Sequence, residues 1–210
     1  MSAFNVQEFA VNLHDALAIL AVVALIGAVL MVVARLTSTV AGFRFLDALH
    51  RVQLPLAAIV AVVATTGSLW FSEGAGWVPC RFCWFQRIFM YSLAVILTVA
   101  AFRRDRGVKW FAAPLAIVGM CISVWHHLIE RRVLEESSVC TSFTSCRNAY
   151  HESFGSIGFD SFTGVFDITG VPFTLAVMAF SGFAAILALL LAPEPLDLLE
   201  EEEDGQPSAG

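Results

Sequence analysis

Five long apolar stretches dominate the pattern of hydrophobic and polar positions along the chain. Residues 16–34, 54–72 and 171–192 contain no charged residue, and residues 110–129 contain none apart from His126 and His127. The remaining stretch, residues 88–102, is too short to cross a bilayer, which needs about 20 helical residues. Its helix is therefore expected to begin near Cys80–Cys83, which places Arg87 inside the membrane boundary. The pattern predicts an all-α integral membrane protein with five transmembrane helices.

The composition supports a membrane protein. Hydrophobic residues make up 58% of the 210 positions and charged residues 14%, whereas soluble domains have about 45–50% and about 25%. This balance excludes a water-soluble globule, a nucleic-acid binder and a disordered chain. The net charge of −6 comes mainly from the C-terminal tail, residues 193–210, which holds seven of the 18 acids. This Glu-rich tail is expected to be disordered.

The basic residues predict the orientation of the spans. Seven of the 12 lie in the two short loops that follow the first and third spans: Arg35, Arg44, Arg51, Arg103, Arg104, Arg106 and Lys109. Because short cytoplasmic loops are enriched in Lys and Arg, these loops and the acidic tail are expected in the cytoplasm, with the N-terminus outside. The first apolar stretch lacks the basic residues that precede the core of a secretory signal, so a retained span is expected.

Four of the five cysteines fall on the predicted outer side. Cys80 and Cys83 lie at the mouth of the third span, Cys140 and Cys146 lie in the long outer loop, and Cys121 lies within the fourth span. Cysteine pairs on the oxidising side of a membrane are plausible disulfides, and such pairs could simply brace the loops. Cys121 is expected to pack as a small apolar residue.

The setting of the first pair suggests chemistry beyond bracing. Cys80 and Cys83 flank a helix start, where backbone N–H groups and the helix dipole stabilise a thiolate. Arg87 follows four residues after Cys83 on the same helical face. An arginine inside a span is costly and usually functional, although one near the interface can also snorkel to the head groups. No metal is expected, because the second pair lacks the Cys-x2-Cys spacing of a zinc knuckle and Trp84 stands where a c-type haem needs His.

The adjacent histidines His126 and His127 lie about one turn before the outer end of the fourth span. Consecutive helical residues point about 100° apart, so at most one of the two is expected to face the bundle interior. Such a histidine could donate a hydrogen bond or a proton to a ligand near Arg87, or it could be satisfied at the membrane interface.

Three segments resemble a known family. Residues 79–87, Pro-Cys-Arg-Phe-Cys-Trp-Phe-Gln-Arg, are similar to the first cysteine motif of the disulfide bond formation protein B family, which includes DsbB and the BdbC proteins. Residues 125–130 and 168–173 resemble the end of that family's third core helix and the start of its fourth. The resemblance divides the chain into an extra transmembrane helix with a basic cytoplasmic loop (residues 1–53), a four-helix core with two cysteine-containing outer loops (54–192) and the acidic tail (193–210).

The resemblance implies a thiol:quinone oxidoreductase of the bacterial cytoplasmic membrane. Such a protein reoxidises an extracytoplasmic DsbA-like oxidase of thioredoxin fold and passes electrons to a membrane quinone, ubiquinone or menaquinone. The implied catalytic residues are the cysteines Cys80, Cys83, Cys140 and Cys146.

The resemblance also implies a role for each residue. Cys140 is expected to be attacked by the partner, with Cys146 as the alternative. Cys146 would exchange with Cys80, and Cys83 would pass electrons to the quinone. Two residues are expected to hold the quinone, Arg87 and, by its spacing from Cys140, His127.

Two other functions remain compatible with the residues. One is a quinone-linked thiol enzyme similar to the vitamin K epoxide reductase family, which places its Cys-x-x-Cys after the loop pair, whereas here it comes first. The other is a non-enzymatic membrane scaffold whose disulfides only brace the outer loops.

Overall fold

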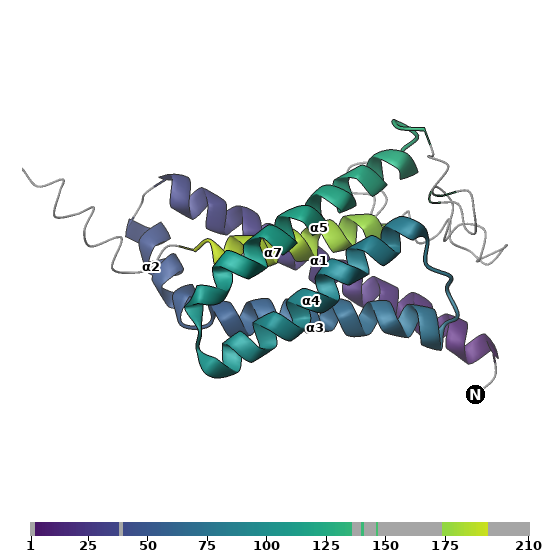
Figure 1. The fold of residues 1–210 in the computed structure, drawn as a ribbon, viewed down its shortest axis with the longest axis horizontal. Helices are drawn as coiled ribbons and strands as arrows, with labels where there is room; N and C mark the ends of the chain where they lie inside the picture. Colours follow the sequence, from purple (N-terminus) through teal and green to yellow (C-terminus); the bar gives the residue numbers. More distant parts are fainter. Residues whose placement is uncertain (1–2, 38–39, 136–139, 141–145, 147–173, 193–210) are drawn as a thin grey trace, which may run out of the picture.

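The computed structural model describes residues 3–37, 40–135, 140, 146 and 174–192 (Figure 1). The start of the fifth predicted span (residues 171–173), most of the outer loop before it and the acidic tail lie outside the described residues. The elements, in chain order, are α1 (Ala3–Thr37), α2 (Val40–His50), α3 (Gln53–Leu69), the π-helical turn η1 (Trp70–Gly74), α4 (Arg81–Arg103), the 3-10 turn η2 (Arg106–Val108), α5 (Lys109–Glu130) and α7 (Leu175–Leu190).

The described residues confirm an all-helical membrane fold. Four helical segments are long and apolar enough to cross a bilayer: Glu8–Thr37, Gln53–Gly74, Arg81–Arg103 and Arg106–Glu130. The helix within the fifth predicted span, α7, is apolar but has only 16 described residues. The described residues therefore contain five long helices, α1, α3, α4, α5 and α7, and the division into an extra N-terminal helix and a four-helix transmembrane core stays a prediction.

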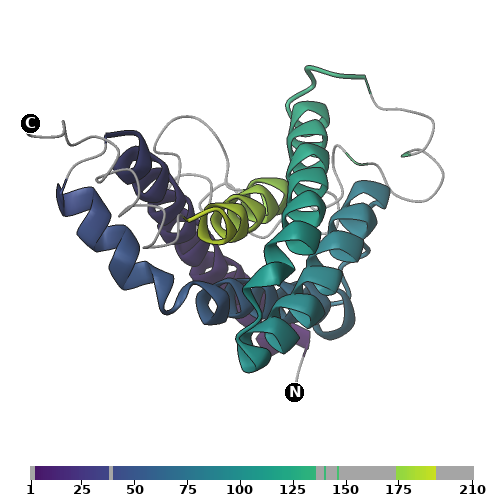
Figure 2. The ribbon, with the colours of Figure 1, turned by 60° about the vertical axis from the view of Figure 1, so that its left-hand side comes forward.

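Helix α7 forms the centre of the bundle (Figure 2), with α1, α3 and α5 packed around it. Helix α4 completes the core between α3 and α5. Phe183 and Ile186 on α7 are fully buried, in the same hydrophobic cluster as Leu93 and Leu97 of α4. Gly119 on α5 allows a close approach, because an added Cβ there would clash with the Phe183 ring. Small residues commonly permit such close packing between membrane helices.

The N-terminal region differs from its expected boundaries. Helix α1 begins at Ala3, well before residue 16, and the predicted basic loop contains the 11-residue helix α2. Leu46 of α2 is buried while Arg44 and Asp47 are exposed, so this helix is amphipathic. Its apolar face packs on the bundle and its charged face points away.

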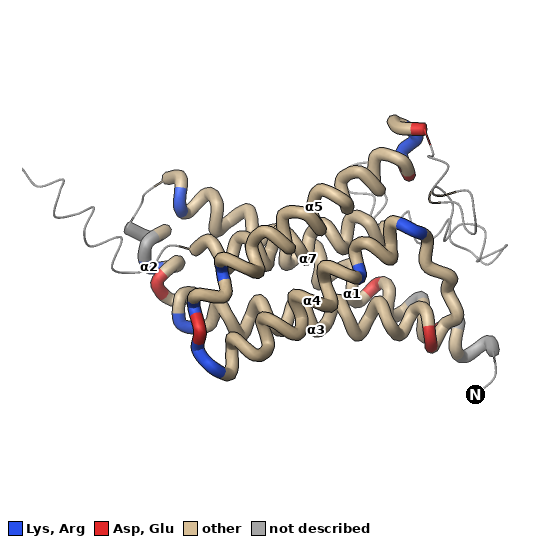
Figure 3. Tube along the Cα trace, in the orientation of Figure 1, with Lys and Arg blue, Asp and Glu red and all other residues tan. Residues whose placement is uncertain are grey.

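Lys and Arg gather at one end of the bundle (Figure 3), where α1 ends, α2 lies and α4 turns into α5. The two basic loops of the sequence pattern therefore share one end, and the N-terminus of α1 and the start of α4 lie at the other. This arrangement is the one that the predicted orientation requires. Which end faces the cytoplasm stays a prediction from the positive-inside rule.

Candidate thiol redox site

The first cysteine pair lies at the N-terminus of α4. Cys80 is the N-cap residue, with extended backbone, and its Sγ accepts a hydrogen bond from the Cys83 N–H at 3.3 Å. The two Sγ atoms are 2.8 Å apart, and both side chains are buried. Because an S–S bond measures about 2.05 Å, the two reduced sulfurs need to approach by less than 1 Å to form a disulfide. The expected helix start at this pair is confirmed.

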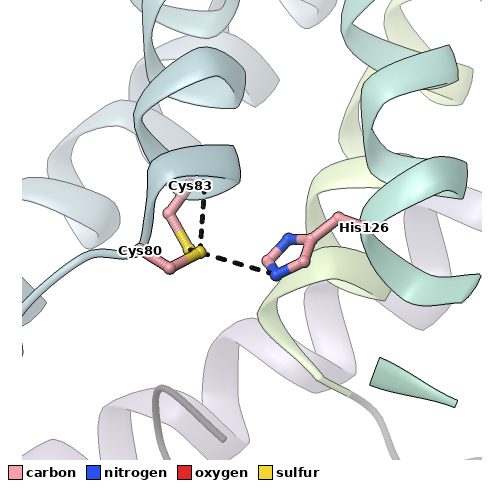
Figure 4. Close-up of side chains that lie close together, drawn as sticks. All are labelled: Cys80, Cys83 and His126. Atoms are coloured by element: carbon pink, nitrogen blue, oxygen red, sulfur yellow. Dashed lines mark hydrogen bonds between the residues drawn. The ribbon is translucent and has the colours of Figure 1, made fainter. Parts of the chain in front are cut away.

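His126 reaches across from α5 to the same pair (Figure 4). Its Nε2 lies 3.5 Å from Cys80 Sγ, and its ring stacks on Phe82 at 5.7 Å between centroids. The same Nε2 lies 3.3 Å from the backbone carbonyl oxygen of Cys146. His126 is fully buried, so it is the one of the two adjacent histidines that faces the interior. It therefore connects the helix pair to the loop pair.

The loop cysteines form a disulfide, Cys140–Cys146, with Cα atoms 5.5 Å apart. Both are buried in one cluster with Cys80, Cys83 and Ile129 of α5. The implied pairing is thus present, and the loop disulfide packs in the same cluster as the reduced thiols of Cys80 and Cys83. The structure holds an oxidised loop pair next to a reduced helix pair.

The reduced pair does not favour a thiolate at Cys80. The hydrogen bond with Cys83 raises the pKa of the Cys80 thiol, and burial raises it further, while backbone N–H groups lower it less. The backbone N–H groups at the helix start therefore lower the pKa of Cys80, as expected from the sequence, but the hydrogen bond with Cys83 and burial outweigh them while both thiols are reduced. The two thiols share a hydrogen bond, and burial disfavours the negative charge of a Cys80 thiolate.

Arg87 lies one turn deeper on α4 and is buried despite its charge. Its Nε donates to Ser68 Oγ at 2.9 Å and its guanidinium Nη2 donates to the Ser68 carbonyl oxygen at 2.8 Å. Its guanidinium carbon also lies 5.3 Å from the centroid of the Trp84 ring, a cation–π arrangement. No carboxylate among the described residues forms an ion pair with Arg87. Its charge is held by α3, next to the π-helical turn η1, a kind of turn that is common at functional sites.

An apolar cavity of about 480 Å³ adjoins this arginine. Its polar lining includes Cys83, Gln86, Arg87 and Ser68, and Gln86 is itself anchored by donating to Ser123 Oγ at 3.0 Å. Most of the remaining lining is aliphatic or aromatic. Small-molecule sites are typically about 300–1,000 Å³ and combine apolar walls with a few polar groups. The residues present therefore fit a lipid-soluble carrier with a polar ring.

His127 lies elsewhere. Its Nδ1 is 3.4 Å from Glu130 Oε2, and the Thr174 hydroxyl at the start of α7 donates to the same carboxylate oxygen at 2.7 Å. His127 is not among the residues that line the cavity. Its expected role in holding a quinone stays a prediction, and the structure offers His126 as the histidine beside the cysteines.

The helix pair and His126 could also be considered as a metal site, since their ligand atoms lie within 4.8 Å of one another. However, two thiolates on one tetrahedral zinc, with Zn–S bonds of about 2.3 Å, stand roughly 3.7 Å apart. The two sulfurs are only 2.8 Å apart here. This spacing favours dithiol–disulfide chemistry over metal binding.

Comparison with known proteins identifies the family. The family description "Disulfide bond formation protein DsbB" matches residues 50–193. The chain belongs to the DsbB family. This membership confirms the resemblance and, with the apolar helices, a multi-pass membrane protein of disulfide bond formation.

Named relatives cover the same part of the chain. Disulfide bond formation protein C of Bacillus subtilis is 39% identical over 134 residues, which are 63% of this chain and 87% of that protein. A probable disulfide formation protein of Deinococcus radiodurans is 38% identical over 142 residues, 67% of this chain and 88% of its own length. No solved structure matches the chain. All of α1, and all of α2 except its last residue, precede the region that the family description matches.

Several residues of the site had no decisive sequence signal. Ser68, Gln86 and Ser123 are polar residues within apolar spans, which is a general sign of interhelical hydrogen bonding. Their partners could not be read from spacing, since each hydrogen bond joins two different helices. Glu130 closes the fourth span in the sequence, and its contact with Thr174 depends on how α5 meets α7.

Proposed function

We propose that this protein is a thiol:quinone oxidoreductase that makes disulfides for an extracytoplasmic dithiol oxidase of thioredoxin fold. The observation that carries the proposal is that the two cysteines of one Cys-x-x-Cys motif have different surroundings. Cys80 meets His126, which also contacts Cys146, whereas Cys83 lines the cavity that contains Arg87. One sulfur is thus placed for exchange with the loop and the other for contact with a lipid-soluble acceptor.

The first exchange takes place at the loop. A partner dithiol attacks the Cys140–Cys146 disulfide, leaves with a disulfide of its own and gives the loop two thiols. The contact of the Cys146 carbonyl with His126 supports Cys146 as the residue that turns toward the helix pair, which leaves Cys140 for the partner. This exchange moves two electrons and two protons from the partner to the loop.

The second exchange passes these electrons to the helix pair. The Cys146 thiolate attacks Cys80 of the Cys80–Cys83 disulfide, and Cys83 leaves. Cys140 then attacks Cys146, restoring the loop disulfide and releasing Cys80. The released Cys80 sulfur lies 3.5 Å from His126 Nε2, which can supply its proton. The product, an oxidised loop beside a reduced helix pair, is the arrangement that the structure holds.

The helix pair then loses two electrons and two protons as its disulfide re-forms. A quinone bound in the cavity supplies the acceptor chemistry, taking up both electrons and both protons. Arg87 lies in the cavity lining with Cys83 and provides the fixed positive charge that stabilises negative charge on a carbonyl oxygen or on a thiolate. Ser68 holds that guanidinium in place, and Gln86 offers a second polar group in the lining.

The decisive experiment is quinone reduction by the purified protein with a reduced thioredoxin-fold oxidase as electron donor. Wild type is expected to turn over, Cys83→Ser to be inactive and the control Cys121→Ser to remain active, because Cys121 is exposed on the outside of α5. Absence of turnover with both ubiquinone and menaquinone would overturn the proposal and favour a scaffold with structural disulfides.

A further inference from the structure

Helix α1, which ends before the region that matches the DsbB family begins, forms one wall of the cavity. Seven of the lining residues lie on it, all of them apolar: Leu17, Leu20, Ala21, Val23, Ala24, Gly27 and Met31. The opposite wall comes mainly from α3, α4 and α7, with Cys83 and Arg87 on α4. The cavity is therefore not a property of the family core alone.

The contacts of α1 explain why space remains between it and α3. Helix α1 packs extensively on α7 and on α2. It meets α3 near the outer end, where Leu17 lies against Gly67 so closely that an added Cβ would be 2.7 Å from the leucine methyl. In the same region Phe9 packs edge-on against Trp70 at 4.9 Å. Toward the other end of the bundle, Phe45 and Leu49 of α2 line the cavity.

The cavity has a polar end and an apolar end. Ser68, the residue that holds Arg87, directly follows Gly67, so the polar part of the lining lies where α1 and α3 meet. From there the lining continues between α1 and α3 to α2 as an apolar surface. A ring near Cys83 would leave any attached hydrocarbon chain to run along α1.

We infer that α1 is the wall of a channel for the polyprenyl tail of the quinone, so that this extra helix selects acceptors by their tails. The inference rests on the proposed function. Burying hydrocarbon against the apolar face of α1 contributes affinity in proportion to the area covered, and about two methylene groups already correspond to a tenfold change. Quinones with long tails should therefore depend on α1, and quinones with short tails should not.

The inference is tested by a substitution on α1 that would place a bulky side chain in the proposed channel. An added Cβ at Gly27 meets no atom within 4 Å, so Gly27→Trp projects a large side chain into the cavity without a clash at its base. Val29→Trp is the matched control, because Val29 is 53% exposed on the same helix and is absent from the lining. Both variants should retain the helical circular dichroism and the gel-filtration profile of the wild type.

The expected result is a change in KM that depends on the tail. For Gly27→Trp, the KM of a quinone with a long polyprenyl tail should rise at least tenfold, while the KM of the same ring with a single isoprene unit and both kcat values stay within twofold. Val29→Trp should change none of these. Equal KM changes for the two quinones, or no change for either, would overturn the inference and leave the proposed function intact. Failure of wild type to reduce either quinone would instead overturn the proposed function.

Photolabelling gives a readout that does not depend on turnover. A quinone with a diazirine at the end of its tail should label a peptide of α1 between Leu17 and Met31, and Gly27→Trp should abolish that labelling while Val29→Trp retains it. Labelling confined to α3 or α4 would place the tail elsewhere and refute the inference. An excess of phospholipid that removes the α1 label from wild type would show that an acyl chain, not the quinone tail, is the occupant.

Discussion

The hydrogen bonds between Arg87 and Ser68 give a sharp test of how the buried cation is held. Ser68→Ala removes the hydroxyl oxygen that accepts from Arg87 Nε at 2.9 Å but keeps the backbone carbonyl that accepts from Nη2 at 2.8 Å. The substitution changes one atom in the wall of the cavity and introduces no new bulk. It therefore changes the position of the guanidinium without removing its charge.

The magnitude follows from the kind of bond that is lost. A hydrogen bond to a charged group contributes about 1.5–3 kcal/mol, and each 1.4 kcal/mol corresponds to about tenfold in an equilibrium constant. Because the carbonyl bond remains, we expect the lower end, about a tenfold rise in the quinone KM. Arg87→Ala removes the cation altogether and should raise the KM further while the protein still folds.

The assay is quinone reduction at saturating reduced partner, with quinone concentration varied. Ser92→Ala serves as control, because the Ser92 hydroxyl donates to the Ile88 carbonyl oxygen of its own helix at 2.8 Å and makes no contact with Arg87. Its KM should match wild type. If Arg87→Ala raises the quinone KM and Ser68→Ala leaves it unchanged, the reasoning that Ser68 positions the guanidinium is refuted.

Three further predictions concern other parts of the bundle. His126→Ala should slow the disulfide exchange from the loop pair to the helix pair by about 10²-fold, and His127→Ala should slow it less. Stopped-flow mixing of the oxidised protein with excess reduced partner measures this rate. Equal effects of the two substitutions would contradict the assigned role of His126. Gly119→Ala should destabilise the protein by about 1–3 kcal/mol, because its Cβ would clash with the Phe183 ring, and Phe183→Leu should restore part of the loss in thermal unfolding. Cys121→Ala should leave turnover within twofold of wild type, and a large loss would assign that cysteine a role.

The helix start at the first cysteine pair and the depth of Arg87 could be predicted from sequence because both are local. A span that needs about 20 residues had to begin before residue 88, and a helix that begins at Cys80 necessarily places Cys83 and Arg87 one turn apart. The structure confirms this placement, with Cys80 as the N-cap of α4 and both cysteines buried. The length of a span, helical geometry and the cost of a charge in lipid were sufficient to predict where α4 begins and where Arg87 lies on it.

The choice between His126 and His127 could not be made from sequence. Which of two adjacent residues faces the interior depends on the rotation of α5 about its axis, and that rotation is fixed by packing such as Gly119 against Phe183. The spacing to Cys140 pointed to His127, but it counts residues through a loop whose path the sequence does not specify. The contact between Cys80 and His126 joins residues 46 positions apart and is a product of the fold.

Helix α2 was not predicted from the sequence, because the basic residues of this segment indicated a cytoplasmic loop. Phe45, Leu46 and Leu49 nevertheless recur at helical spacing, which is the signal that could have predicted the helix. Charge density predicts which side of a membrane a segment occupies and says nothing against a helix that lies there. The apolar face of α2 proves to matter, because Phe45 and Leu49 line the cavity.

The three-residue separation of Cys80 and Cys83 suits the proposed function, in which one small bundle would exchange electrons with two redox partners in different solvents. As the N-cap, Cys80 lies outside the helix and meets the loop disulfide and His126, where exchange involves protein thiols. Cys83 lies in the first turn and lines the cavity, where the proposed acceptor would be a quinone dissolved in the membrane. A disulfide between them needs little movement, since the sulfurs are already 2.8 Å apart. In the proposed mechanism, electrons would therefore pass from the loop disulfide to the membrane acceptor by bond exchange within one helical turn of α4.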